Sequence, residues 1–357
     1  MSVQKHIKAS VRALEAYSVK SKPLSPELIK LNQNENPFDI PAEVKDELLE
    51  ELRRIPWNRY PDVFPSALIE ALAADLGIPM ESIIAANGSN ELMYTIMMAV
   101  VSRGTKVLIP TPTFFLYEKI VAVMEGELVT VPARADLSFD VDAIVAAAQR
   151  ERPALIVLNS PNSPTGQMLR LDEVQRIIDC TDALILVDEA YIEFAEQPSV
   201  QSLLASCDRL IILRTFSKAY SLAGLRIGYL LAQPALCAEL LKPKIPFTVN
   251  NYSSAAAIML MKRKELILDR IRYVREQKQR LYSALSAIGG IKTFSSQTNF
   301  LIFQAEQNAA QLFGKLLSEN VLVRDVSSYP QLERMLRVNA GTEQENAAFL
   351  TALKKHL

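Results

Sequence analysis

Residues 209–226 read R-L-I-I-L-R-T-F-S-K-A-Y-S-L-A-G-L-R, and they carry the strongest indication of the fold. It opens on a short run of large apolar residues without polar alternation, which is typical of a strand buried on both faces. Polar residues and a lysine come directly after that strand. In open α/β sheets ligands bind beyond the carboxyl ends of the strands, so we expect a binding site at this point of the chain.

The same pattern recurs on both sides of this stretch. Further apolar runs, most of them unbroken and expected to form buried strands, occur at 106–109, 127–131, 154–158, 183–187 and 227–232. Helical periodicity lies between several of them, at 114–124, 140–150 and 171–179. Alternating strands and helices predict a mainly parallel sheet covered by helices, so the expected fold class is α/β.

We expect a large domain followed by a smaller one. The 357 residues of the chain are more than one small core needs. A long helical pattern at 251–288 ends at two glycines, and short strand and helix patterns follow it to the C-terminus. We therefore predict an N-terminal arm at 1–30 associated with the small domain, a large domain at 31–250 and a small α+β domain at 251–357.

Composition and charge argue against several classes of function. The net charge is -1 and the Lys and Arg residues are scattered, which argues against nucleic acid or an anionic membrane as a partner. No window is long enough to span a membrane and the first residues lack a secretory signal, so we expect a cytoplasmic protein. The two histidines, His6 and His356, lie near the chain ends, so we expect neither a metal site nor a histidine-based triad.

Lys218 is the candidate for covalent chemistry. Two hydroxyl residues, Thr215 and Ser217, precede it, and Arg226 lies eight residues beyond it. Hydroxyls combined with a guanidinium bind phosphate well. A lysine beside them suits an aldehyde cofactor that carries its own phosphate, if burial or cationic neighbours lower the pKa of its amine. An isolated lysine would be assigned to the surface, but this surrounding pattern favours a site.

A carboxylate and a phenol follow the apolar run at 183–187. Burying Asp188 there is unfavourable unless the carboxylate is paired, and a protonated ring nitrogen is a suitable partner. Such a pair would make the ring an electron sink. Tyr191 could then donate to an oxygen on the same ring. The alternative for Asp188 is an aspartate that only caps a helix.

Three weaker signals lie at other strand ends. The loop N-S-P-N-S-P-T-G at 159–166 predicts a rigid turn, compatible with a cis bond, whose amide side chains suit an oxygen ligand or simply stiffen a surface turn. The segment Gly88-Ser89-Asn90 opens a helix whose free amides favour phosphate. Phe114 or its neighbour could stack on a planar ring, although core packing is the commoner role of a phenylalanine.

Taken together, these motifs resemble the fold-type-I aminotransferases that depend on pyridoxal phosphate. The likeness covers nearly the whole chain and follows the family's order: glycine turn, aromatic, asparagine loop, Asp-x-x-Tyr, Ser-Lys and arginine. Within the family the chain is most similar to the histidinol-phosphate aminotransferases, on the segments L-N-Q-N-E-N-P at 31–37, R-Y-P-D at 59–62 and L-R-V-N-A-G-T at 336–342. The resemblance implies pyridoxal 5′-phosphate as the cofactor and a homodimer as the working form.

The resemblance also assigns roles to single residues. Lys218 would form the Schiff base and move the proton, Asp188 would pair with the ring nitrogen and Tyr191 with the ring oxygen. Phe114 would stack on the ring. The implied cofactor-phosphate ligands are Ser89, Asn90, Thr215, Ser217, Arg226 and, from the neighbouring subunit, Tyr60. The implied substrate ligands are Tyr17, Asn36, Arg324 and Arg337.

One position departs from the family pattern. The family often has two adjacent asparagines before Pro-Thr-Gly, the second of which binds the ring oxygen. Here that second position is Ser163. We expect Asn162 to make this contact instead, through a small shift of the loop.

The implied reaction is transamination between histidinol phosphate and 2-oxoglutarate, with Lys218 serving as both base and acid. Two alternatives keep the fold and the cofactor. One is an aromatic amino acid aminotransferase, in which Arg337 would bind the α-carboxylate, and the other is a decarboxylase of threonine phosphate. A non-catalytic regulator that binds pyridoxal phosphate is disfavoured, because the chain has no room for a DNA-binding module before residue 30.

Overall fold

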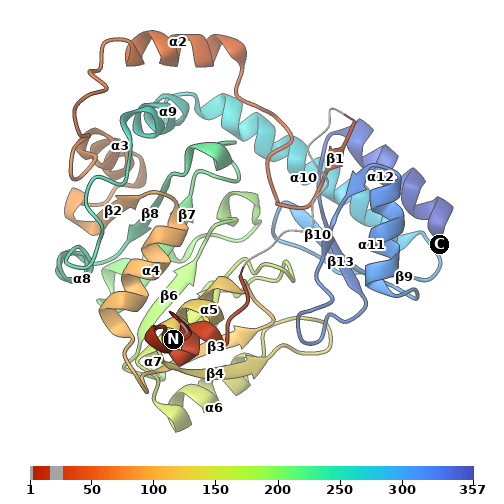
Figure 1. The fold of residues 1–357 in the computed structure, drawn as a ribbon, viewed down its shortest axis with the longest axis horizontal. Coiled ribbons are helices and arrows are strands. Elements are labelled where there is room, and N and C mark those ends of the chain that lie inside the picture. Colours follow the sequence, from red (N-terminus) through yellow and green to blue (C-terminus); the bar gives the residue numbers. More distant parts are fainter. Residues whose placement is uncertain (1–2, 17–26) are drawn as a thin grey trace.

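The computed structural model describes residues 3–16 and 27–357. A seven-stranded sheet forms the centre of the larger half of the molecule, on the left in Figure 1, and a four-stranded sheet forms the centre of the smaller half, on the right. Within the described ranges, none of the helices combines the length and the hydropathy that crossing a bilayer requires.

The large sheet is mainly parallel, which confirms the predicted fold class. Its strands are β2 (Ile83–Ala86), β3 (Lys106–Thr111), β4 (Glu127–Pro132), β5 (Leu155–Asn159), β6 (Leu184–Asp188), β7 (Leu210–Thr215) and β8 (Gly228–Leu231). Their spatial order is β2-β8-β7-β6-β5-β3-β4. Strands β3 to β7 all run parallel to one another, whereas β8 is antiparallel to both β7 and β2. The connection from β3 leads to β4 on one side of the sheet, and the connection from β5 leads to β6 on the other. A ligand crevice is expected between β3 and β5, where the two connections diverge.

Helices cover both faces of this sheet. They are α3 (Ser66–Leu76), α4 (Ser89–Val100), α5 (Leu116–Val123), α6 (Val141–Glu151), α7 (Leu171–Asp179), α8 (Pro234–Leu240) and α9 (Asn251–Met261). Successive strand residues face different cores: Ile185 and Ile212 pack with α3, α6, α7 and α9, whereas Leu186 and Ile211 pack with α4, α5 and α8. Burial on both faces explains why most of the strands are unbroken apolar runs, whereas the edge strand β4 is mostly exposed and contains polar residues.

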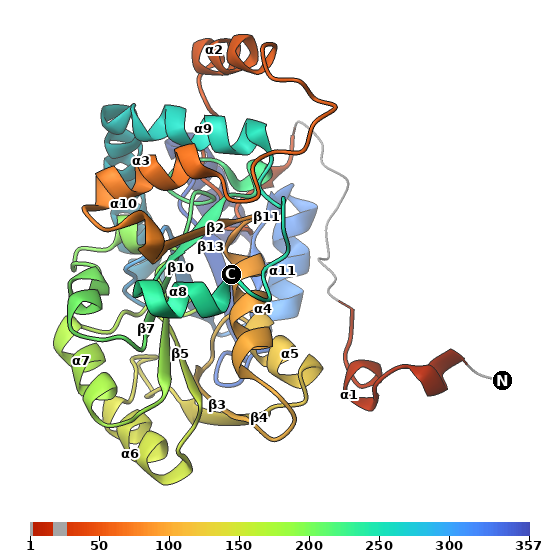
Figure 2. The same ribbon diagram turned by 90° about the vertical axis from the view of Figure 1, so that its left-hand side faces the viewer.

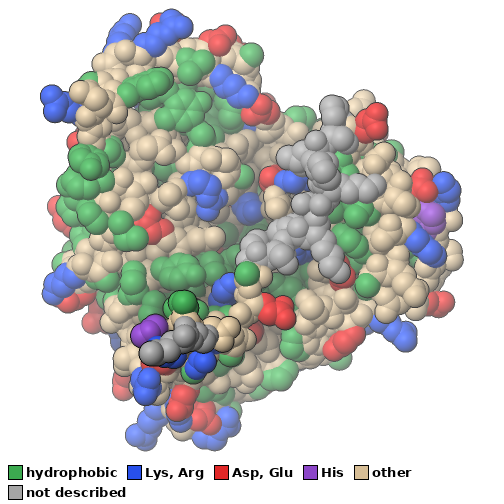
Figure 3. All heavy atoms as spheres, viewed as in Figure 1, with side chains coloured by type: hydrophobic (Ala, Val, Ile, Leu, Met, Phe, Trp, Pro, Cys, Tyr) green, Lys and Arg blue, Asp and Glu red, His purple; other side chains and the backbone are tan. Residues whose placement is uncertain are grey.

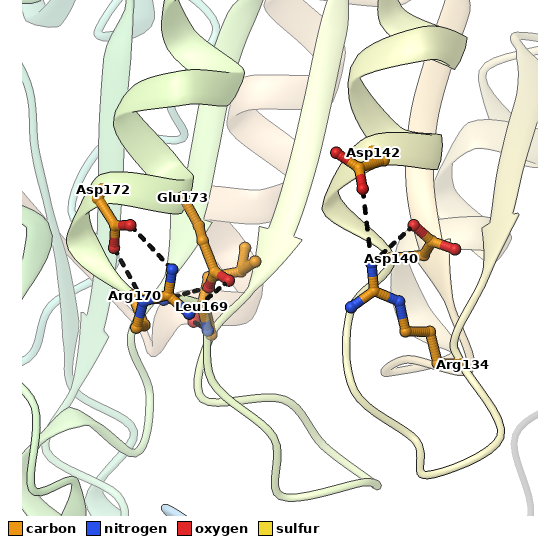
Figure 4. Close-up of polar contacts among 8 residues, drawn as sticks. Arg134, Asp140, Asp142, Leu169, Arg170, Asp172 and Glu173 are labelled. Atoms are coloured by element: carbon orange, nitrogen blue, oxygen red, sulfur yellow. Dashed lines mark hydrogen bonds and ion pairs between the residues drawn. The ribbon is translucent and has the colours of Figure 1, made fainter.

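The helices α6 and α7 begin at neighbouring polar turns (Figure 4). Asp140 accepts a hydrogen bond from a first-turn amide of α6 at 3.2 Å and pairs with Arg134 at 3.2 Å. The Arg170 backbone amide donates to the Glu173 carboxylate at 2.8 Å, and its guanidinium pairs with Asp172. Exposed ion pairs add at most about 1 kcal/mol each, so their main effect is to define where the helices start.

The smaller half is built on an antiparallel sheet. Its strands, in spatial order, are β12 (Arg324–Asp325), β13 (Met335–Asn339), β10 (Phe300–Ala305) and β9 (Ile291–Thr293), and its helices are α10 (Lys264–Ser286), α11 (Ala309–Ser318) and α12 (Glu343–His356). The helix α10 joins the two halves, because Ile271 and Val274 belong to the core of the large sheet and Leu281 and Leu285 to the core of the small one.

The single helix expected at 251–288 is in fact two, α9 and α10. The chain leaves helical geometry at Arg263, whose φ is -105° and ψ is 52°. The two helices face different surroundings, since α9 is buried among apolar residues whereas α10 is amphipathic. No Gly or Pro marks the break, so periodicity alone could not show it.

The N-terminal segments contact both halves. Strand β1 (Ile29–Lys30) pairs in parallel with β11 (Val321–Leu322) of the smaller half. Helix α1 (Ala9–Arg12) contacts α5 of the larger half, and Figure 2 shows the segment 3–12 beside the body rather than within it. Helix α2 (Ala42–Leu52) packs on α9 at the outer edge.

Candidate active site

A cavity of about 440 Å³ lies between the two halves, at the carboxyl ends of the parallel strands. Figure 3 shows this hollow, with basic side chains inside it. The predicted residues that line it are Ser89, Asn90, Phe114, Asp188, Tyr191, Thr215, Ser217, Lys218, Arg226, Arg324 and Arg337. Most of the expected site is therefore brought together by one cavity. Among the described residues, no group of His, Cys, Asp or Glu side chains is arranged to hold a metal ion.

Lys218 lies on the turn that follows β7. Its Nζ donates to the Gln33 carbonyl at 3.0 Å and lies 5.8 Å from the centroid of the Tyr191 ring. The carbonyls of Lys218 and Ala219 accept hydrogen bonds from the Asn36 amide at 3.4 and 3.2 Å. Asn36 does not line this cavity, because its amide is engaged with the lysine turn. These bonds support a positioning role for Asn36, and its expected substrate contact stays a prediction.

The expected phosphate ligands converge on the N-terminus of α4. Gly88 is the N-cap residue, with φ +79°, and no side chain caps the helix there. The amides of Ser89 and Asn90 are therefore available to an anion. The Arg226 guanidinium lies against Gly88, where a Cβ would approach its Nη2 to 2.5 Å, and donates to the Ser217 hydroxyl at 3.3 Å. Amides, hydroxyls and a guanidinium thus form one cup, which we call the phosphate cup.

Gly228 is a site residue that the sequence reasoning missed. It opens β8, and a Cβ at this position would lie 2.3 Å from the backbone nitrogen of Ser89. Only a glycine lets the start of α4 pack directly on the strand. A glycine that opens an apolar run is the available signal, since glycine in a strand often marks a close backbone approach.

Asp188 ends β6 at the floor of the cavity and is 2 % exposed. The Ala190 amide donates to its Oδ1 at 3.0 Å, and the hydroxyl of Tyr117 donates to its Oδ2. Burial raises the pKa of Asp188 to about 6, while the bond from Tyr117 lowers it. Tyr117 is fully buried in α5, and burial raises its own pKa well above the usual range. The sequence reasoning missed Tyr117, because a tyrosine in a helical pattern is usually core.

Tyr191 is held in place by Asn34, a second residue that the sequence analysis did not assign to the site. Its hydroxyl accepts a hydrogen bond from the Asn34 amide at 2.9 Å, and its ring meets the Phe300 ring edge-on at 5.3 Å. Asn34 lies in the quoted segment 31–37, from which only Asn36 was expected in the site. Because Asn34 donates, the proton of the Tyr191 hydroxyl remains for another acceptor.

Asn162 is not among the residues that line the cavity, so its expected contact with the ring oxygen stays a prediction. Its buried amide donates to the Pro112 carbonyl at 2.9 Å and to the Thr165 hydroxyl at 2.7 Å. Its Oδ1 accepts from the Thr113 hydroxyl at 2.9 Å. These bonds hold the loop together, and Ser163 lines the cavity instead. The loop does contain cis peptide bonds, before Pro161 and before Pro164.

Arg337 reaches this loop from β13. Its Nη1 donates to the Ser163 hydroxyl at 3.1 Å and its Nη2 to the Asn32 carbonyl at 2.8 Å. The guanidinium also lies over the Phe300 ring, 5.0 Å from its centroid. Arg324 stands directly opposite Arg337 in the antiparallel pair of β12 and β13. Like charges directly opposite each other are unfavourable, so this pair favours an anion in the cavity.

Two expected residues lie elsewhere. Tyr60 is 83 % exposed and contacts Phe247 at a ring distance of 5.0 Å, so it does not line the cavity of its own chain. Tyr17 lies outside the described residues.

A buried ion pair braces the strand end next to Thr215. Glu189 is 0 % exposed and Arg214 is 7 % exposed. The two side chains meet at 3.0 Å, and Arg214 also donates to the Ser199 hydroxyl at 2.7 Å. The pair lies behind the cavity and supports its floor.

Comparisons with known proteins agree with this geometry. Residues 26–353 match the model of the aminotransferase class I and II family. The histidinol-phosphate aminotransferase of Chlorobaculum parvum is 49 % identical over 91 % of this chain and 92 % of that protein, and the enzyme of the same name from Chlorobium phaeobacteroides is 45 % identical over 99 % and 97 %.

A solved structure is also similar. The histidinol-phosphate aminotransferase from Sinorhizobium meliloti in complex with pyridoxal-5′-phosphate has a TM-score of 0.86 and 26 % identity, over 98 % of this chain and 96 % of that one. The chain therefore belongs to the class I and II aminotransferase family. It is an enzyme of that class.

Proposed function

We propose that this enzyme transfers the amino group of histidinol phosphate to 2-oxoglutarate, a step of histidine biosynthesis, with pyridoxal 5′-phosphate as its cofactor. The relatives at 45–49 % identity carry the name histidinol-phosphate aminotransferase, which supports this substrate. The observation that carries the proposal is a cavity with two separate anion sites. The phosphate cup of the larger half suits the cofactor, and Arg324 with Arg337 suits a second phosphate on the substrate.

The residues of the cavity fit this cofactor. The phosphate cup has open amides at a glycine N-cap, a guanidinium and hydroxyls. Asp188 is a buried carboxylate with a raised pKa, which a cationic ring nitrogen would bring down. Lys218 lines the same space as Asp188 and Phe114, so an aldehyde held between them is within reach of an amine.

Lys218, Asn36 and Tyr191 each have a separate role in the proposed reaction. When bound, the cofactor accepts the amino group and serves as an electron sink for the substrate carbon. Lys218 Nζ removes the proton of that carbon and returns it on the cofactor side, and Asn36 holds the turn that carries the amine. Tyr191 donates its free proton to the ring oxygen, because its own oxygen is occupied by Asn34.

The covalent role of Lys218 is tested by trapping. The wild-type enzyme should be yellow, and borohydride reduction should fix the cofactor covalently on the peptide that contains Lys218. Lys218→Ala should take up no covalent label, and its turnover should fall at least ~10³-fold. Lys242→Ala, at an exposed lysine, is the matched control and should label normally. Covalent label in Lys218→Ala would show that another lysine carries the cofactor.

Half-reactions separate the proposed substrate from the two alternatives. We expect kcat/KM to be higher for histidinol phosphate than for phenylalanine, and no release of carbon dioxide from threonine phosphate. A preference for phenylalanine would favour an aromatic aminotransferase, and release of carbon dioxide would favour a decarboxylase. Either result would contradict the proposed substrate.

We also propose that the enzyme works as a homodimer in which Tyr60 reaches the cofactor phosphate of the neighbouring subunit. The exposure of Tyr60, and of Trp57 and Phe247 around it, supports an apolar surface that a second copy covers. Light scattering should give twice the chain mass of 39.8 kDa. Mixing Lys218→Ala with Tyr60→Ala should restore activity, because one site of each hybrid dimer is then intact, and absence of rescue would contradict the exchange.

A cytoplasmic location is part of the same proposal. Cys180, Cys207 and Cys237 are all unpaired, which supports a reducing compartment. Cell fractionation checks this location, and recovery of the enzyme outside the cytoplasmic fraction would contradict it.

A further inference from the structure

Tyr329 lies in the loop between β12 and β13 and lines the cavity. The loop is held by its own turns, since the Tyr329 amide donates to the Val326 carbonyl and the Leu332 amide to the Tyr329 carbonyl, both at 3.1 Å. The partly buried ring packs against an apolar cluster that includes Val326, Leu332 and Met335. The side chain is therefore set in place before any ligand arrives.

Tyr329 lines the cavity together with Arg324 and Arg337, and its hydroxyl has one proton to donate. Its oxygen accepts a hydrogen bond from the backbone of Phe115, the residue that precedes α5 in the other half of the molecule. Burial raises the pKa of Tyr329, so the phenol is protonated at neutral pH. Because a phenol has one proton and its oxygen is occupied by the amide, this proton is left for a ligand in the cavity.

The charged groups around this hydroxyl are mostly cationic. Arg324 and Arg337 line the same cavity as Tyr329, and both lower its pKa. Neither guanidinium can accept a hydrogen bond. The carboxylate that acts on Tyr329 is Glu118 of α5, whose own pKa is raised by burial.

We propose that Tyr329 is a specificity-determining residue, whose hydroxyl donates to the substrate phosphate that Arg324 and Arg337 hold. This inference rests on the proposed function and deepens it. A phosphate monoester offers three acceptor oxygens and close to two negative charges, which match two guanidinium groups and one phenol. A carboxylate offers two oxygens and one charge, so it leaves one of the three donors without a full partner. Tyr329 thus favours a substrate that ends in phosphate over one that ends in carboxylate.

Tyr329→Phe tests this role, because it removes the donor and keeps the ring. The variant loses a hydrogen bond to a charged group only when the amino-group donor carries a phosphate. The ratio of kcat/KM for histidinol phosphate to kcat/KM for histidinol should therefore fall about tenfold. The loss should appear in KM, as expected when binding is weakened equally in the ground and transition states. The competitive inhibition constant of inorganic phosphate should rise by a similar factor in the holoenzyme.

The matched control is Tyr282→Phe, at a partly buried tyrosine of α10 that packs in the core of the smaller half. It should leave the ratio and the inhibition constant as they are in the wild type. An unchanged ratio in Tyr329→Phe, or an equal loss with histidinol and histidinol phosphate, would overturn the role of Tyr329. If the wild type fails to convert histidinol phosphate, the proposed function is wrong, and the inhibition constant of inorganic phosphate still decides whether Tyr329 binds phosphate.

Discussion

Asp188→Asn should make the cofactor-free enzyme more stable at neutral pH, although it damages the site. The Asp188 carboxylate is 2 % exposed, and burial raises its pKa from 3.8 to about 6. An acid whose pKa is higher in the folded chain than in the unfolded chain binds its proton more tightly when folded. Its contribution to stability is therefore neutral below about pH 4, becomes unfavourable as the pH rises to about 6, and stays unfavourable above that.

The expected size follows from the same values. A pKa change from 3.8 to about 6 lowers the unfolding free energy of the wild type at pH 7 by about 3 kcal/mol, relative to a chain whose carboxylate keeps its ordinary pKa. Asparagine removes this loss but keeps one acceptor oxygen for the two donors Tyr117 and Ala190, so a hydrogen bond of about 1 kcal/mol disappears. We expect the cofactor-free variant to be about 2 kcal/mol more stable than the wild type at pH 7, and about 1 kcal/mol less stable at pH 4.

The measurement is urea unfolding of both cofactor-free proteins between pH 4 and pH 8, compared as a difference. Other acids titrate in this range, such as Glu193, whose pKa burial raises to about 7, and they cancel because both proteins contain them. Asp208→Asn, at a side chain that is 89 % exposed, is the matched control for loss of a carboxylate.

Cofactor binding should change in the opposite direction. Loss of the charge facing the ring nitrogen should weaken pyridoxal phosphate binding by about 100-fold in a spectroscopic titration. This prediction would be refuted by a stability difference that is flat from pH 4 to pH 7, or by a variant that is less stable than the wild type at pH 7. Either result would mean that burial of the charged Asp188 carboxylate does not destabilise the folded chain.

Two further substitutions test the supports of the site. Gly228→Ala would put a Cβ 2.3 Å from the Ser89 nitrogen, so we expect cofactor affinity, measured by absorbance titration, to fall at least ~10-fold. Gly314→Ala is the control and should leave the affinity unchanged, because a Cβ there meets nothing within 4 Å. Equal affinities of the two variants would contradict the close approach at Gly228. Arg214→Met would leave the buried Glu189 without its ion-pair partner, so urea unfolding should show a loss of about 3–5 kcal/mol, and a loss below about 1 kcal/mol would mean that the pair is dispensable.

Much of the larger half was predictable because its signals are local. A strand buried on both faces is an unbroken apolar run, whatever it packs against, and β5, β6, β7 and β8 show this pattern over most of their length. Residues directly after such runs meet at one edge of a parallel sheet, so the sequence predicts that Lys218, Asp188 and Phe114 lie together, and all three line one cavity.

The sequence was less informative where the decisive contact joins distant segments. The run at β2 is only four residues long and pairs with β8, far along the chain, so nothing local distinguished it. Asn162 had the expected residue type at almost the expected position, but the backbone turn pointed its amide at Pro112 and Thr113. Chemical type predicts what a side chain can bind, whereas the turn decides what it faces.

The amino-acid order was enough to predict the fold class, the lysine that we propose carries the cofactor, and the ends of the strands that surround it, because these depend on hydrophobic periodicity and on the cost of burying charge. The tertiary structure alone decided that Tyr117 supports Asp188, that Gly228 admits the start of α4, and that Tyr329 reaches across from the smaller half. Each of these is a single contact between elements far apart in the chain. Such contacts depend on how packed layers meet in space, and no local pattern records that.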